Sequence, residues 1–120
     1  MKTHTQYQQI NAFTTRDGST IRELMHPEQH GNCNQSLAEA RIEIAQETRL
    51  HRHHRSEELY HITRGHGLMT LGDSTFEVEV GDTIQISPGT AHKICNTGDE
   101  ELIILCCCAP AYDHDDTELL

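Results

Sequence analysis

Turn-forming residues divide the second half of the sequence into short, regular pieces. From residue 65 onward a glycine recurs every seven to nine positions, at Gly65, Gly72, Gly81, Gly89 and Gly98. Between these turns lie short runs in which apolar and polar residues alternate, as in residues 75–80. Alternation with a period of two indicates half-buried strands, and closely spaced turns between strands are typical of sandwiches and barrels. The sequence therefore predicts an all-β domain.

The chain divides into three predicted parts. Residues 1–35 form an N-terminal extension with strands, residues 36–110 form the barrel, and residues 111–120 form an acidic tail expected on the surface. Inside the barrel, residues 68–80 are predicted to form a β-hairpin that turns at Gly72-Asp73. Residues 37–44 alternate like a strand but contain the helix formers Ala, Glu and Arg, so pattern alone leaves strand and helix open.

Size and charge exclude several classes of protein. A chain of 120 residues has room for one domain of ordinary size. Nine basic against nineteen acidic residues give a net charge of −10, which argues against a nucleic-acid partner. The longest apolar stretch, residues 102–109, is far shorter than the ~20 residues of a membrane span. Because residues 1–9 have no apolar core, no secretory signal is visible, and we expect a cytoplasmic protein without a membrane partner.

The five cysteines are expected to be free thiols. Cys33 and Cys95 stand alone, whereas Cys106, Cys107 and Cys108 are consecutive. An odd number without a secretory signal indicates a reducing compartment. Neighbouring residues of a strand face opposite ways, so the triplet is poorly arranged for disulfides. We expect small buried side chains, with a reactive thiol beside a site as the alternative.

Histidine is the unusual residue of this sequence. Of the ten histidines, His51 and His53 are two positions apart, so on a strand both would face the same way. Glu58 follows five residues later, and His92 follows a predicted turn at Pro88-Gly89. Imidazole and carboxylate groups are common ligands of divalent metal ions, and this clustering predicts a metal site.

The spacing of these residues resembles the two motifs of the cupin superfamily. His51, His53, Glu58 and Gly65 match the first motif, G-x5-H-x-H-x4-E-x6-G, in which Ala45 replaces the leading glycine. The second motif is G-x5-P-x-G-x2-H-x3-N, with Ser87 in the proline position. The matching residues of this motif are Gly81, Gly89, His92 and Asn96. The resemblance covers residues 36–110.

This resemblance implies a fold and a set of ligands. The fold would be a double-stranded β-helix, a jelly-roll barrel, and residues 37–44 would then be a strand. The metal ligands would be His51, His53, Glu58 and His92, holding one divalent ion. Mn, Fe, Zn, Ni and Cu are all compatible with such ligands. An ion that only stiffens the barrel is the alternative, although structural sites usually have four closed ligands that include sulfur.

Motif spacing selects Glu58 over its neighbour Glu57 as the carboxylate ligand. If Glu58 faces inward, strand alternation places Tyr60 and Ile62 inside with it and His61 outside. The Tyr60 hydroxyl is then a candidate for proton transfer. With the opposite alternation, His61 would line the site instead.

The resemblance also suggests activities. Residues 56–60 and 89–94 are similar to the cupin half of mannose-6-phosphate isomerases, which implies isomerisation of a small anionic or sugar-like metabolite through a metal-stabilised enediolate. An iron- or copper-dependent dioxygenase and a non-catalytic metal- or sugar-binding module are the alternatives. We also expect a homodimer, formed through sheet faces or through a predicted strand at residues 21–25.

Overall fold

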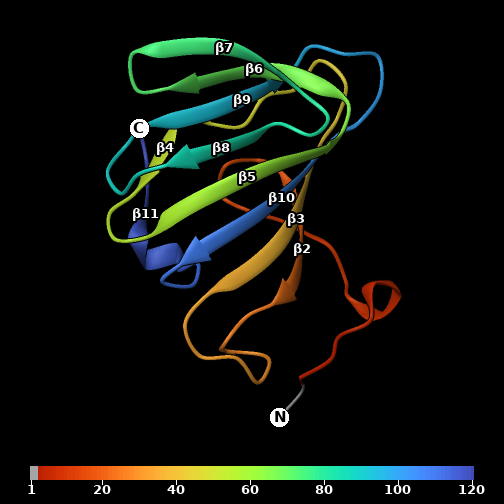
Figure 1. The fold of residues 1–120 in the computed structure, drawn as a ribbon, viewed down its shortest axis with the longest axis vertical. Coiled ribbons are helices and arrows are strands. Elements are labelled where there is room, and N and C mark those ends of the chain that lie inside the picture. Colours follow the sequence, from red (N-terminus) through yellow and green to blue (C-terminus); the bar gives the residue numbers. More distant parts are fainter. Residues whose placement is uncertain (1–2) are drawn as a thin grey trace.

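The computed structural model describes residues 3–120 and contains two antiparallel sheets that face each other (Figure 1). The six-stranded sheet contains, in spatial order, β1 (Phe13–Thr14), β2 (Thr20–Met25), β3 (Ser36–Ile42), β10 (Leu102–Ala109), β5 (Glu57–Arg64) and β8 (Thr83–Ile86). The five-stranded sheet contains β11 (Thr117–Leu119), β4 (His51–His53), β9 (His92–Asn96), β6 (His66–Leu71) and β7 (Ser74–Glu79). Two single 3₁₀ turns complete the described part, η1 (Tyr7–Gln9) and η2 (His114–Asp116). The predicted double-stranded β-helix is confirmed.

Strand pairing resolves the ambiguous segment of the first half. Residues 37–42 belong to β3, which pairs along its whole length with β10. The predicted hairpin is the β6–β7 pair, and all five cysteines are free. Within β10, Cys106 and Cys108 are buried, whereas Cys107 faces the other side of the sheet. The strand and free-thiol predictions are therefore confirmed.

A layer of aliphatic side chains between the two sheets forms the core. Fully buried side chains come from both sheets, and the largest are Ile62, Met69, Ile94, Leu102 and Ile104. Burying one such side chain stabilises the fold by roughly 1.5–3 kcal/mol. In residues 3–120 no helix has the length and apolar composition to cross a membrane.

Short strands near both ends of the described chain belong to the sheets. β2 pairs with β3 on one side and, at its first two residues, with β1 on the other. The expectation of a surface tail at residues 111–120 is wrong, because β11 pairs with β4 and Asp116 is buried. The Asp116 carboxylate accepts the backbone N–H groups of Arg55 and Ser56, which explains how an acidic segment can lie against the barrel.

Two motif positions have left-handed backbone conformations. Gly65 has φ +78°, and a Cβ there would lie 2.7 Å from the carbonyl oxygen of Glu101, so only glycine fits. Ala45, which replaces the first motif glycine, also has a positive φ of 65°. The turn keeps the conformation that the motif requires, at the cost of a strained alanine.

Candidate metal centre

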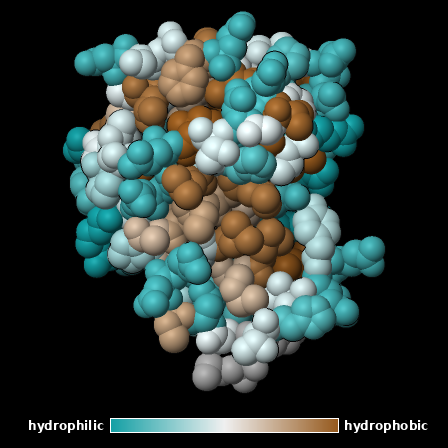
Figure 2. Space-filling view, in the orientation of Figure 1, coloured by the Kyte–Doolittle hydropathy of each residue, from teal (hydrophilic) through white to brown (hydrophobic). Residues whose placement is uncertain are grey.

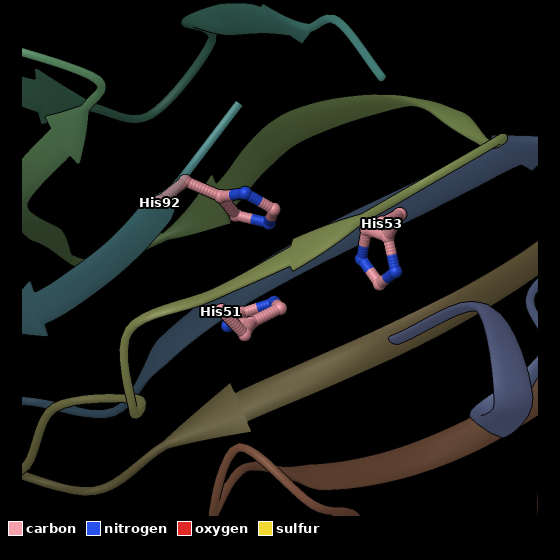
Figure 3. Close-up of side chains that lie close together, drawn as sticks. All are labelled: His51, His53 and His92. Atoms are coloured by element: carbon pink, nitrogen blue, oxygen red, sulfur yellow. The ribbon is translucent and has the colours of Figure 1, made fainter. Parts of the chain in front are cut away.

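Two neighbouring strands of the five-stranded sheet carry three inward-facing histidines. His51 and His53 alternate with Arg52 on β4, so both imidazoles are buried on the same face. His92, the first residue of β9, is directly opposite His51 in the strand pairing. One ring nitrogen from each histidine lies within 4.8 Å of the others, and Figure 3 shows the three rings gathered in one space.

In two of the rings, the Nδ1 atom that faces away from the cluster is held by an oxygen that can only accept. His51 Nδ1 lies 2.7 Å from the carbonyl oxygen of Arg49, and His92 Nδ1 lies 2.9 Å from that of Thr90. Carbonyl oxygens accept hydrogen bonds, so both Nδ1 atoms carry the proton.

The third imidazole is fixed through a hydroxyl group. His53 Nδ1 lies 3.0 Å from Thr117 Oγ1, which donates its own hydrogen to the carbonyl oxygen of Asp113. Thr117 Oγ1 therefore accepts from His53. In a neutral imidazole with Nδ1 protonated, the lone pair is on Nε2, so all three rings offer a ligand atom to the same space.

Glu58 brings a carboxylate from β5 to these imidazoles. Its Oε1 lies 3.2 Å from His53 Nε2 and 3.4 Å from His92 Nε2. The Cys108 thiol donates to its Oε2 at 3.3 Å. Burial raises the pKa of Glu58, but its two imidazole neighbours, His53 and His92, outweigh burial and lower it to about 2. Glu58 is therefore a carboxylate at any physiological pH.

The chemistry of these donors fits a divalent metal ion. Glu58 Oε1 and His92 Nε2 are buried, and neither has a hydrogen-bond partner among residues 3–120. Buried polar atoms without partners are rare, and a cation would satisfy both. Burial, and then the charge of His92, lower the pKa of His51, which favours the neutral ring that a metal requires. The cluster of His51, His53 and His92 could therefore bind a metal ion.

The alternation predicted for β5 is confirmed. Glu58, Tyr60 and Ile62 are buried, whereas Glu57 and His61 are exposed. The Tyr60 ring lies 6.0 Å from the His92 ring, measured between centroids. Burial, and then the charge of Glu58, raise the pKa of Tyr60 well above 10. Its phenol therefore stays protonated near neutral pH and can donate a hydrogen bond, but it is a poor base.

A cavity of about 50 Å³ lies beside the imidazoles and extends between the sheets. A single water needs roughly 10–15 Å³ on this measure, so the cavity has room for about three to five waters or a ligand of a few non-hydrogen atoms. Small side chains on β3 and β10 leave this space open, namely Ser36, Ala38, Ala40, Cys106 and Cys108.

The cavity has lining residues that the sequence did not reveal. Asp17, in the turn between β1 and β2, places Oδ2 3.8 Å from His51 Nε2. Glu23 on β2 and Tyr112 after β10 also line the cavity. No sequence signal marked these three residues, because Asp17-Gly18 reads as an ordinary turn and the other two lie outside both motifs.

The fold and the site together define a β-barrel with an internal histidine cluster and a cavity beside it. Residues 38–108 match the model of the cupin domain, and the chain belongs to that family. It is 53% identical, over 97% of its length and 93% of the relative, to an uncharacterised protein of Methanocaldococcus jannaschii.

Solved structures of low sequence identity share this fold. One is the Streptomyces nucleoside dehydratase Pac13, with TM-score 0.81 and 15% identity over 100% of this chain and 92% of that one. Another is the polyketide cyclase RemF of Streptomyces resistomycificus, with TM-score 0.83 and 20% identity over 100% and 86% of the chains. A predicted oxalate decarboxylase of Thermotoga maritima has TM-score 0.78 and 20% identity over 89% and 98%.

Proposed function

We propose that this protein is a metal-dependent enzyme that isomerises a small anionic or hydroxylated metabolite. The observation that carries the proposal is the set of three imidazoles held at Nδ1, with the carboxylate of Glu58 beside them, at a cavity of about 50 Å³. Structural neighbours that are enzymes, a dehydratase and a cyclase among them, support a catalytic role for such a barrel. As a ligand set we propose His51, His53, Glu58 and His92.

The bound ion would supply positive charge that stabilises negative charge developing on a substrate oxygen. The other contributions to catalysis come from the cavity wall and from Tyr60. Apolar side chains such as Ile21, Ile42 and Ile104 form part of the cavity wall and lower its polarity, which strengthens electrostatic interactions there. The protonated Tyr60 phenol faces the same cavity and donates a hydrogen bond to a substrate oxygen. Isomerisation of a hydroxycarbonyl compound also needs a group that carries a proton between adjacent carbons.

A dioxygenase is the second candidate. His53, His92 and Glu58 form a group of two histidines and one carboxylate, with both nitrogens within 3.4 Å of Glu58 Oε1. Two histidines and one carboxylate are the ligands of many non-haem iron oxygenases. Such an enzyme would consume dioxygen, which an isomerase does not.

Metal analysis of the purified protein tests the proposal. We expect about one divalent ion per chain, with most of it lost in His51→Ala and in His92→Ala. His54→Ala is the matched control, because the His54 side chain is 52% exposed and contacts Glu118. Occupancy should fall below about pH 6, where protons compete for imidazoles. Full occupancy in either site variant would overturn the ligand set.

Assays with candidate substrates then separate the activities. Isomerisation without dioxygen uptake supports the proposal, and dioxygen uptake supports the second candidate. Saturable ligand binding without turnover by either route would instead identify a binding module.

A further inference from the structure

A second carboxylate, Glu23, lies in the wall of the same cavity. Glu23 is only 8% exposed to solvent. Its Oε1 atom is buried and has no hydrogen-bond partner among residues 3–120. Glu23 and the imidazoles of His51 and His53 line one continuous space. A buried carboxylate without a partner is costly for the fold, so it calls for a ligand or a chemical role.

Strand register explains why Glu23 can reach a ligand in this space. On the six-stranded sheet Glu23 is opposite Ala38, Ala38 is opposite Cys106, and Cys106 is opposite Tyr60. The side chains between Glu23 and Tyr60 are therefore small, and they leave the space above β3 and β10 open. Glu58 lies two residues from Tyr60 on β5, so the two carboxylates line the same cavity from different strands of the sheet.

Glu23 also borders two depressions on the outside of the barrel. One is formed by residues of the N-terminal segment, and the other involves the loop after β2 and residues 112–115. Glu23 is thus placed between the internal cavity and solvent. A proton held there can exchange with water outside, whereas Glu58 is enclosed by imidazoles and a thiol.

We propose that Glu23 is the proton carrier of this cavity, the group that takes a proton from one carbon of the substrate and returns it to the next. This inference rests on the proposed isomerase function and assigns the base that function requires. The Glu23 carboxylate removes the proton from the hydroxyl-bearing carbon beside a carbonyl group. The electron pair of that C–H bond forms the C=C bond of an enediolate, and the former carbonyl oxygen takes the negative charge.

The return step completes the isomerisation. Protonated Glu23 gives its proton to the former carbonyl carbon, while a proton passes from the original hydroxyl oxygen to the new one. The hydroxyl and carbonyl groups have then exchanged places. No oxidant or reductant is consumed, because the electrons stay within the substrate.

The surroundings of Glu23 suit a group that both takes and gives a proton. Burial raises its pKa to about 7, with His26 lowering the value and Glu28 raising it. Other titratable groups at the adjoining depressions are His30, Tyr112, Asp113, His114 and Asp115. A pKa near the working pH is the most effective for general acid–base catalysis.

Deuterium incorporation tests this assignment without knowledge of the natural substrate. The probes are glycolaldehyde, glyceraldehyde and dihydroxyacetone, incubated with the metal-containing protein in deuterium oxide and analysed by mass spectrometry. We expect the wild type to place deuterium on the carbon beside the carbonyl group, and Glu23→Gln to do so at least about 100-fold more slowly. Glu77→Gln, at an exposed position of β7 in the other sheet, is the matched control and should match the wild type.

Further readouts test the assignment beside the size of the activity loss. Metal content and melting temperature of Glu23→Gln should show that the site and the fold are intact. Infrared difference spectra between wild type and Glu23→Gln should show a protonated carboxyl group that ionises near pH 7. The wild-type exchange rate should rise through the same pH, and this rise should be absent in Glu23→Gln.

The outcomes separate the inference from the proposed function. Equal exchange in wild type and Glu23→Gln would overturn the role of Glu23 and leave the isomerase proposal standing. A metal-loaded wild type that exchanges none of the three probes would contradict the isomerase proposal, and the role of Glu23 with it. A carboxyl group that is already ionised at pH 5 would also overturn the inference.

Discussion

Glu58 and Glu57 are adjacent carboxylates with opposite surroundings. Glu58 faces two imidazoles and a thiol, whereas Glu57 is exposed and accepts a hydrogen bond from Gln85. We expect Glu58→Ala to lose most of its metal and activity and Glu57→Ala to keep both. Elemental analysis of the two purified variants checks this prediction. Metal loss in Glu57→Ala alone would reverse the assignment.

Single residues show what local spacing can and cannot predict. The three histidines and Glu58 lie within two short motifs, so their spacing was enough to group them. Alternation along β5 was likewise enough to place Tyr60 inside and His61 outside. Asp17 and Glu23 could not be found in this way, because a hairpin far from both motifs brings them to the cavity.

Strand β11 supports the metal centre through one hydroxyl group. Thr117 Oγ1 accepts the Nδ1 proton of His53, and Thr117→Val would remove that acceptor at nearly constant volume. We expect metal affinity to fall by about 10–100-fold, the usual effect of losing such a partner. Calorimetric titration of the metal-free protein with zinc measures the change, and Thr117→Ser should restore most of the affinity.

The turn between β3 and β4 contains the strained Ala45. An L-residue with positive φ costs roughly 1–2 kcal/mol, which glycine avoids, although glycine also gives the unfolded chain more freedom. We therefore expect Ala45→Gly to raise the free energy of unfolding by about 0.5–1 kcal/mol. Urea unfolding of both proteins tests this, and a less stable variant would contradict the explanation.

Most elements follow from the sequence pattern, and the exceptions have a common cause. β5, β6 and β7 have clear alternation and glycine turns, so their positions could be predicted. β11 has an acidic sequence, and its pairing depends on Asp116 meeting the backbone of residues 55–56, which are about 60 positions away. Such non-local contacts leave no local periodicity.

The stability of the whole molecule should depend on pH through Glu23. Its pKa is raised to about 7 in the folded protein, against an ordinary value of 4.5. Between these values the folded state binds more protons than the unfolded state, so stability is lost as pH rises through about 7. Glu23→Gln lacks the titrating group and therefore avoids this loss. The free energy of unfolding of Glu23→Gln, relative to that of the wild type, should rise by about 1–3 kcal/mol between pH 5 and pH 8. Urea unfolding at the two pH values measures it, and a constant difference would contradict the prediction.

An apolar row on the outer face of the six-stranded sheet is where we expect a homodimer to form. Met25, Leu37, Cys107 and Leu59 are successive partners across four strands, and the two leucines are exposed. Figure 2 shows hydrophobic residues gathered in the middle of the molecule, over β5 and β10. Contiguous exposed apolar patches are typical of interaction sites.

Sedimentation tests the dimer. The wild type should have twice the 13.6 kDa mass of one chain, and Leu59→Glu should be a monomer. Val80→Glu is the control, because Val80 is exposed at the end of β7, away from that row. A wild-type monomer at micromolar concentration would refute the prediction.

The contact between His53 and Thr117 has a consequence for the order of events during synthesis. It joins residues 64 positions apart, and contacts of such separation form late because the chain between them must first be ordered. All three histidines precede Thr117 in the chain, and until Thr117 pairs with its strand neighbours His53 lacks the acceptor that fixes its ring. The aliphatic core, by contrast, draws on strands that end at residue 109 and contains none of the four proposed ligands. We therefore expect a metal ion to bind after the barrel has folded, as the last step of maturation.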